Sequence, residues 1–259
     1  MKIKEVVETL ERFAPLPLQE SYDNAGLQIG LTEADASGVL LCLDVTEEVV
    51  AEAIEKNCNV IVAHHPLLFR GLKRIADSNM IERCVRQAIL HGVTIYAAHT
   101  NLDNVLGGVN FEIAKRLGLT QVSFLEPLPQ GGGGSGVIGL LPQAESSIDF
   151  LKRVKQIFQV DCLQHNAPLE RMVRKVALCG GSGDFLLEKA IKEGADVFLT
   201  GEMGYHHFFG YDQQIQIGVL GHYQSEQYTI NLLADVLRQA DETLRLERTT
   251  VNTNPIHYL

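Results

Sequence analysis

Residues 39–65, VLLCLDVTEEVVAEAIEKNCNVIVAHH, decide the fold class of this chain. They contain two short apolar runs, 39–43 and 60–63, on either side of segment 47–56, where apolar residues recur at helical spacing. A short apolar run bounded by polar residues predicts a fully buried strand. Two such strands joined by a helix predict a parallel pair, so this stretch is interpreted as one β-α-β unit of an α/β protein.

The same alternation continues on both sides of this unit. Ile3, Val6 and Leu10 predict an amphipathic helix that ends before Pro15. Further strands are predicted at 93–97, 136–141, 173–179, 197–200 and 217–220, and further helices at 80–91, 109–117, 148–158, 185–192 and 226–239. We therefore expect an α/β protein with mixed, largely parallel sheets.

One stretch near the middle interrupts this alternation. Pro127, Pro129 and the glycines at 131–134 break every periodic pattern. We predict a boundary there, with a first α/β lobe at 1–126, a second at 127–259 and no middle insertion domain. The glycine-rich residues 131–136 are interpreted as a connector, a hairpin or hinge between the lobes.

The strand-helix-strand unit occurs twice in the sequence. Without a gap, residues 39–65 align with residues 176–202. A second alignment places the pattern His-x-x-x-acid at the end of a strand in both halves, at His99 with Asp103 and at His222 with Glu226. We interpret the chain as a duplicated α/β lobe, with the functional site where the two copies meet.

Composition excludes several classes of protein. The chain has 259 residues and a formal net charge of −10, which repels nucleic acid and anionic lipid. We find no secretory leader and no apolar run long enough to span a membrane, so we expect a cytoplasmic protein. The five cysteines form no C-x-x-C pair, and we interpret them as buried thiols.

Two adjacent histidines, His64 and His65, follow the apolar run at 60–63. Open α/β sheets bind ligands at the carboxyl ends of their strands. Further imidazole and carboxylate groups follow two other predicted strands, at His99, Asp103, His222 and Glu226. Such nitrogen and oxygen donors suit zinc, iron, manganese or nickel, and a bridging carboxylate among them would hold two metals that activate a water. The sequence predicts a dinuclear metal centre.

Weaker signals lie near these histidines. Arg70 and Lys73 follow them in an otherwise acidic chain, either as an anion-binding loop or as a solvated basic loop. Residues 180–183, Gly-Gly-Ser-Gly, form either a phosphate cradle or a tight turn before a helix. Glu202 ends the strand equivalent to the one before His64, which makes it a candidate proton donor or acceptor.

In combination, these motifs resemble those of the NIF-three-like proteins, also known as type-two GTP cyclohydrolase homologues. The resemblance covers nearly the whole chain and rests on residues 22–27, 63–69, 99–103, 181–184, 196–202 and 221–226. It implies two intertwined α/β repeats and, for a chain of the short type, a toroidal homo-hexamer.

The resemblance also implies roles for individual residues. The positions of the family's metal ligands fall on His64, His65, Asp103, His222 and Glu226, with Glu226 bridging two divalent ions. His99 then lies behind the ligands or on the substrate side, and it is a candidate catalytic residue together with Glu202.

Three functions are compatible with such a centre. The first is a metal-dependent hydrolase that acts on a nucleotide or another phosphorylated small molecule, with Arg70 or Lys73 binding its anionic part. The second is a metal-handling or insertion factor that delivers an ion to client proteins. The third is a structural ring in which metal joins the lobes without catalysis.

Overall fold

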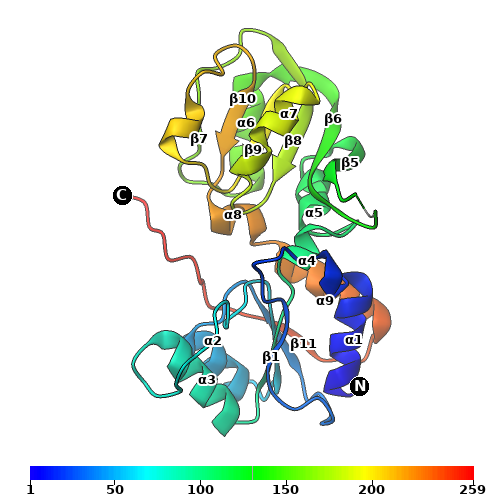
Figure 1. Ribbon diagram of the computed structural model, residues 1–259, viewed down its shortest axis with the longest axis vertical. Helices are drawn as coiled ribbons and strands as arrows, with labels where there is room; N and C mark the ends of the chain where they lie inside the picture. Colours follow the sequence, from blue (N-terminus) through cyan, green and yellow to red (C-terminus); the bar gives the residue numbers. More distant parts are fainter. Residues whose placement is uncertain (130) are drawn as a thin grey trace. The chain divides into compact units, whose positions relative to one another are not determined.

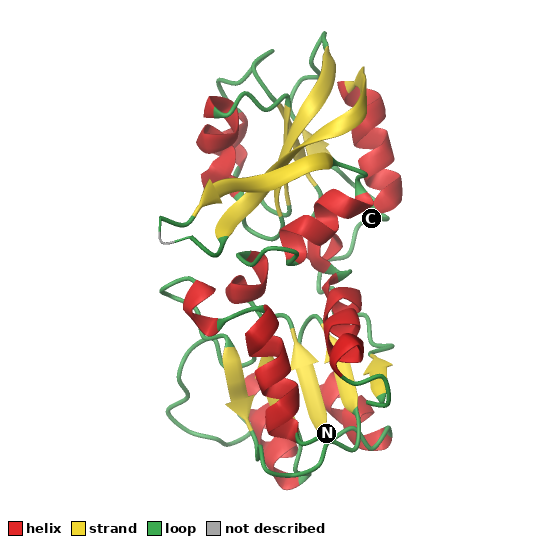
Figure 2. Ribbon diagram, turned by 90° about the vertical axis from the view of Figure 1, so that its right-hand side faces the viewer, coloured by secondary structure: helices red, strands yellow, loops and turns green. Residues whose placement is uncertain are grey.

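The computed structural model describes residues 1–129 and 131–259 and divides the chain into two compact units. Unit 1 comprises Met1–Leu102 and Thr229–Pro255, and unit 2 comprises Asp103–Tyr228 and Ile256–Leu259. Each unit has its own β-sheet, with helices on both faces (Figure 1, Figure 2). Both sheets combine parallel and antiparallel strands, which confirms the mixed α/β class.

The sheet of unit 1 has five strands in the order β1-β4-β3-β2-β11. Four of them run parallel, namely β2 (Val39–Cys42), β3 (Val60–Ala63), β4 (Thr94–Ala97) and β11 (Leu246–Arg248), whereas β1 (Gly26–Ile29) is antiparallel to β4. Every residue of β2, β3 and β4 is buried, as in parallel strands that are covered on both faces. The strands predicted from residues 39–97 are confirmed.

Helices α2 (Glu47–Glu55) and α3 (Met80–Leu90) cover one face of this sheet, and α1 (Ile3–Phe13) and α9 (Thr229–Ala240) cover the other (Figure 1). Each helix buries the apolar stripe that its sequence predicts, for example Ile3, Val6 and Leu10 of α1. Two short helices, η1 (Leu16–Leu18) and α4 (Thr100–Asp103), complete the segment up to the start of unit 2.

The sheet of unit 2 has six strands in the order β5-β6-β8-β9-β10-β7. The strands are β5 (Thr120–Pro127), β6 (Gly134–Ser146), β7 (Gln164–His165), β8 (Met172–Cys179), β9 (Val197–Thr200) and β10 (Gln216–Val219). The three strands β8, β9 and β10 are parallel, and the other pairings are antiparallel. The helices are α5 (Val109–Arg116), α6 (Ser147–Ile157), η2 (Asp184–Leu186), α7 (Leu187–Lys192), η3 (Tyr205–Phe208) and α8 (His222–Glu226).

The glycine-rich stretch lies inside unit 2, between the paired strands β5 and β6. The amide of Leu128 donates to the carbonyl of Gly133 at 2.9 Å and closes a hairpin turn. Gly131 and Gly132 have φ of 75° and 82°, a left-handed conformation that glycine adopts without steric cost. The hairpin was expected, but its placement between lobes is wrong, because it joins two strands of one sheet. Residue 130 lies outside the described residues.

The division into units differs from the boundary expected at 126/127. The chain leaves unit 1 after Leu102 and returns to it at Thr229, because α9 and β11 complete the first sheet and its helical layer. A boundary inferred from local composition does not detect such a return.

Two further expectations concern single features. Cys42, Cys58 and Cys84 are buried as predicted, but Cys162 is exposed. Among the described residues, no helix is long and apolar enough to cross a membrane.

Candidate metal centre

The predicted ligands follow the carboxyl ends of strands, as the sequence indicates. In unit 1, His64 and His65 come directly after β3, and His99 comes two residues after β4. In unit 2, His222 begins α8 three residues after β10, and Glu226 ends the same helix. The two units are described separately below.

In unit 1, three imidazole rings lie close together. The ring centroid of His64 lies 4.8 Å from that of His65, and the centroid of His99 lies 5.5 Å from each of the other two. His64 is completely buried, whereas the other two rings are partly exposed. The sequence separates His99 from the pair by 34 residues, and the adjacent strands β3 and β4 bring the rings together.

Each of these rings is held through Nδ1 by an oxygen atom. His64 Nδ1 donates to the carbonyl of Ala98, His65 Nδ1 bonds Oδ1 of Asp44, and His99 Nδ1 bonds Oδ1 of Asp23, all at 2.7 Å. Metal-binding histidines typically have this arrangement, because a donor bond at one ring nitrogen directs the lone pair of the other toward the ion. In all three rings, Nε2 is therefore the nitrogen that is not held by these bonds.

The two carboxylates that hold these rings are ionised. Burial by itself raises the pKa of Asp23, but hydrogen bonds from His99 and Thr100 outweigh this and lower the pKa to about 2. Burial also opposes ionisation of Asp44, and hydrogen bonds from His65 and Thr253 lower its pKa. Ionised carboxylates behind the rings increase the basicity of the imidazoles toward a metal.

In unit 2, His222 and Glu226 lie one turn apart on α8. His222 Nε2 lies 3.1 Å from Oε2 of Glu226, and His222 Nδ1 lies 3.0 Å from Oε1 of Glu202. Glu226 is buried, and a buried carboxylate requires a partner that compensates its charge. His222 therefore resembles the three rings of unit 1 in having an oxygen at Nδ1. Its Nε2 faces the carboxylate of Glu226.

Glu202, which contacts His222, is itself held in place by Ser182. Ser182 donates a hydrogen bond from Oγ to Oε2 of Glu202 at 2.5 Å. This bond lowers the pKa of Glu202, and the charge and hydrogen bond of His222 lower it further, against the effect of burial. The candidate proton donor or acceptor of the sequence is thus an ionised carboxylate that positions His222.

The turn at 180–183 is a tight turn and not an open cradle. The amide of Gly180 donates to Asn110, that of Gly181 to Ser225, and that of Gly183 to Thr200, at 2.9–3.0 Å. These amides are already satisfied by side chains, so they are not available to a phosphate.

The other predicted site residues are Asp103, Arg70 and Lys73. Asp103 ends α4 and is partly buried, four residues after His99. Arg70 and Lys73 are exposed in the loop between β3 and α3. Within the part of the chain that the structure describes, neither cation contacts the histidines.

The donor set fits a divalent ion. His64 and His65 of unit 1 each offer a ring nitrogen and Glu226 of unit 2 offers a carboxylate oxygen, which are donor atoms of the kind that hold a metal ion. Imidazole and carboxylate donors without a thiolate suit the borderline divalent metals of the first transition row.

Sequence reasoning missed the residues behind the ligands. Asp23 and Ser182 lie in stretches that the sequence analysis quotes, but neither they nor Asp44 were predicted to hold or support a site residue. The one available signal is that Asp44 follows β2 by two residues, at the same sheet edge as His64.

These features define a two-unit α/β protein with a candidate metal centre. The chain belongs to the Duf34/NIF3 (NGG1p interacting factor 3) family, whose sequence profile matches residues 1–255.

Relatives and solved structures agree with this assignment. The chain is 35% identical to a Lactococcus lactis protein named GTP cyclohydrolase 1 type 2 homolog, covering 99% of both chains. It is 32% identical to a Clostridium acetobutylicum protein of the same name, covering 93% of this chain and 91% of the relative. The structure of a Staphylococcus aureus hypothetical protein superposes with a TM-score of 0.92 at 28% identity, covering 100% of this chain and 99% of the other.

Proposed function

We propose that this chain is a dinuclear metal-dependent hydrolase that acts on a nucleotide or another phosphorylated small molecule. The observation that carries the proposal is the common arrangement of His64, His65, His99 and His222. Each ring has an oxygen at Nδ1, so Nε2 is the nitrogen that would bind an ion. His91, His165 and His207 also have an oxygen at Nδ1, so this bond alone does not identify a ligand. The four candidate rings differ in that they follow strand ends, where three of them lie with ring centroids 4.8–5.5 Å apart.

In this proposal the ligands come from both units. His64 and His65 of unit 1 and Asp103, His222 and Glu226 of unit 2 hold two ions, with Glu226 as the bridge. Bound divalent ions lower the pKa of a water and polarise the oxygen that it attacks.

The chain's own residues prepare this chemistry. Asp44 and Glu202 hold His65 and His222 in place, and Asp23 holds His99. His99 is not one of the ligands in this proposal, so its Nε2 is the candidate to accept or return a proton. Arg70 and Lys73 bind the anionic part of the substrate.

One pair of strands in each sheet occupies an equivalent place in the two sheets. In unit 1, Val39 pairs with Val60 where β2 meets β3, and in unit 2, Val176 pairs with Val197 where β8 meets β9. The gapless alignment of residues 39–65 with 176–202 predicts this same pairing. It supports a duplication of the strand-helix-strand unit.

Nucleotide chemistry is supported by the relatives' names. Proteins that are 32–35% identical over nearly the whole chain are named GTP cyclohydrolase 1 type 2 homologs. We carry this over as a substrate class, a nucleotide or phosphorylated small molecule.

The first test is the metal content of untagged protein by elemental analysis. We expect about two divalent ions per chain in the wild type and loss of both ions in Glu226→Ala, because the bridging carboxylate binds both. His91→Ala removes an exposed histidine of unit 1 and serves as the matched control. One ion or none in reconstituted wild type contradicts the dinuclear centre.

The second test is turnover. Metal-loaded protein is incubated with GTP and a panel of phosphoesters, and the expected activity disappears in Asp103→Ala. No turnover across the panel by protein that holds its metal contradicts the hydrolase and favours a metal-handling factor. Transfer of the ion to an apo-metalloenzyme faster than from free metal under a chelator then tests that alternative.

We also propose that the chain assembles as a homo-hexamer, on the strength of the family resemblance. Light scattering on the eluting protein measures the mass in solution. A mass of about six chains agrees with the proposal, and a monomer mass contradicts it.

A further inference from the structure

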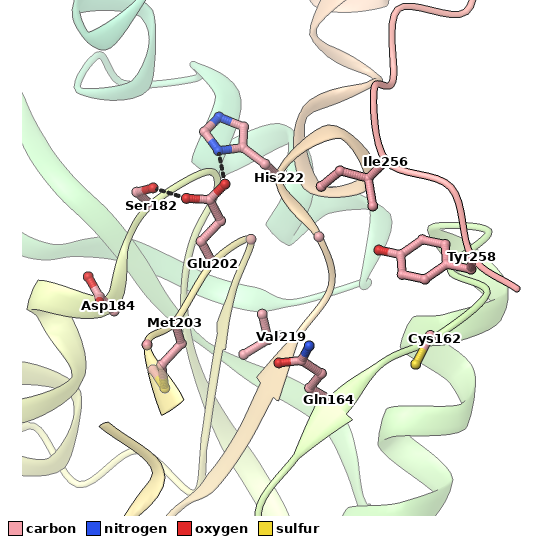
Figure 3. Close-up of a pocket in the computed structure, with 13 residues that line it drawn as sticks. Cys162, Gln164, Ser182, Asp184, Glu202, Met203, Val219, His222, Ile256 and Tyr258 are labelled. Atoms are coloured by element: carbon pink, nitrogen blue, oxygen red, sulfur yellow. Dashed lines mark hydrogen bonds and ion pairs between the residues drawn. The ribbon is translucent and has the colours of Figure 1, made fainter. Parts of the chain in front are cut away.

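Unit 2 contains a pocket of about 450 Å³ beside the carboxyl ends of β9 and β10 (Figure 3). His222 and the two residues bonded in series to it, Glu202 and Ser182, line one side of the pocket. The pocket therefore lies next to the part of the proposed centre that unit 2 supplies.

The charge of this pocket is negative. Asp184 and Glu202 line it, and no lysine or arginine lies among its described lining residues. Ser182 and His222 occupy both oxygens of Glu202. Asp184 has one oxygen, Oδ2, bonded to His207 at 2.8 Å. We therefore assign Asp184 as the carboxylate that accepts hydrogen bonds from a bound molecule.

The opposite side of the pocket is mostly apolar and aromatic, with Gln164 as a polar member. Val219, Ile256 and Tyr258 line it, and Figure 3 shows Tyr258 across the pocket from Asp184, with its hydroxyl group toward the interior. An aromatic wall facing a carboxylate suits a flat ring that carries N–H donors, because the ring packs on tyrosine while the donors reach the oxygen. An anionic group is repelled by the same carboxylates.

We propose that this pocket binds the planar, N–H-bearing end of the substrate, of the aromatic amidine or amino-heterocycle type, and excludes its anionic end. This inference rests on the proposed function, since it names which part of that enzyme's substrate unit 2 binds.

The test uses three probes of nearly equal shape and different charge. Benzamidine, benzamide and benzoate are titrated into the full-length protein in EDTA, with binding measured by calorimetry and folding checked by circular dichroism. EDTA removes direct coordination of benzoate by a metal. We expect benzamidine to bind most tightly and benzoate at least tenfold more weakly. Benzoate that binds as tightly as benzamidine overturns the proposal.

Variants locate the binding site. Asp184→Asn is expected to weaken benzamidine about tenfold and to leave benzamide within twofold, because only the cation depends on the carboxylate charge. Glu188→Gln removes one exposed carboxylate of the same unit outside the pocket and controls for net charge. Benzamidine binding that is unchanged in Asp184→Asn, or equally weakened in Glu188→Gln, contradicts the assignment.

The aromatic wall is tested in the same way. Tyr258→Ala is expected to weaken benzamidine and benzamide alike, about fivefold. Tyr205→Ala, an exposed tyrosine that does not line this pocket, is expected to change neither. Because these measurements need no metal and no turnover, they separate this proposal from the hydrolase. If the probes bind in the expected rank order but no hydrolysis is found, only the hydrolase is contradicted. If hydrolysis is found but the probes do not follow this rank order, only the pocket assignment is contradicted.

Discussion

Gly181 leaves no space for a side chain beside Glu226. A Cβ at this position would clash with Oε1 of Glu226 and lie 3.3 Å from Nε2 of His222, and φ is 59°. We predict that Gly181→Ala displaces the carboxylate and lowers both the melting temperature and the metal content. Gly194 also has a positive φ, 71°, but nothing lies within 4 Å of its Cβ position. Gly194→Ala should therefore cost only the backbone strain, about 1 kcal/mol, and keep its metal. Equal metal content in the two variants contradicts the prediction.

Asp44 affects the proposed metal centre through its contact with His65. Because its carboxylate holds His65 Nδ1 at 2.7 Å, Asp44→Ala is expected to weaken metal affinity about 10- to 100-fold. Competition with a chromogenic chelator measures this affinity on untagged protein. Asp77→Ala, an exposed aspartate of the same unit, is the control, and a similar loss in both variants shows that net charge is responsible.

The candidate ligands could be selected from the sequence, whereas the carboxylates that hold their rings could not. His64 and His65 are recognisable because they end an apolar strand, which is a local pattern. Asp23 and Asp44 contact histidines 76 and 21 residues away. Such a contact depends on how loops meet above the sheet, and no periodicity in the sequence carries that information.

At the scale of elements, Glu52 joins helix α2 to the segment that follows β11. Its buried carboxylate accepts hydrogen bonds from Lys56, from Thr249 and from the amide and hydroxyl of Thr250. Burial opposes ionisation, but these bonds prevail and lower the pKa from 4.5 to about 2. In the unfolded chain the carboxylate binds its proton at higher pH, so it stabilises the fold above about pH 4.5. This contribution is lost as pH falls toward 2.

We predict that Glu52→Gln destabilises the protein at pH 7 by about 2–3 kcal/mol and that the difference from wild type shrinks as pH falls from 5 to 2. Urea unfolding at several pH values measures both quantities. Glu48→Gln changes an exposed carboxylate of the same helix and should have little effect. A difference between wild type and Glu52→Gln that is constant with pH shows that the bonds do not depend on ionisation.

The elements that sequence predicted are those whose apolar pattern is complete. Strands β2, β3, β4 and β9 are buried at every residue, and their short apolar runs reveal them. Strands β1, β5, β7 and β11 lie at sheet edges, with polar or partly exposed residues, and they were missed. Burial of an edge strand is incomplete, so its sequence resembles that of a loop.

At the scale of the whole molecule, the proposed centre draws ligands from both units, which makes metal binding a link between their stabilities. A ligand that binds only the folded state stabilises it by about 3–4 kcal/mol at 100 to 1,000 times its dissociation constant. We predict that added metal slows amide hydrogen exchange in β3 of unit 1 and in β9 of unit 2 together.

A substitution of a ligand in one unit should then reduce the metal-induced protection in the other unit as well. Glu226→Ala removes a ligand of unit 2 and is expected to abolish the metal-induced protection of β3 as well as that of β9, and His64→Ala is expected to do the same from unit 1. His91→Ala should leave the protection of both strands intact. Mass spectrometry of exchanged peptides resolves the two strands within one experiment. If each substitution removes protection only in its own unit, the ions occupy separate sites, and the shared dinuclear centre is wrong even where the metal content is two per chain.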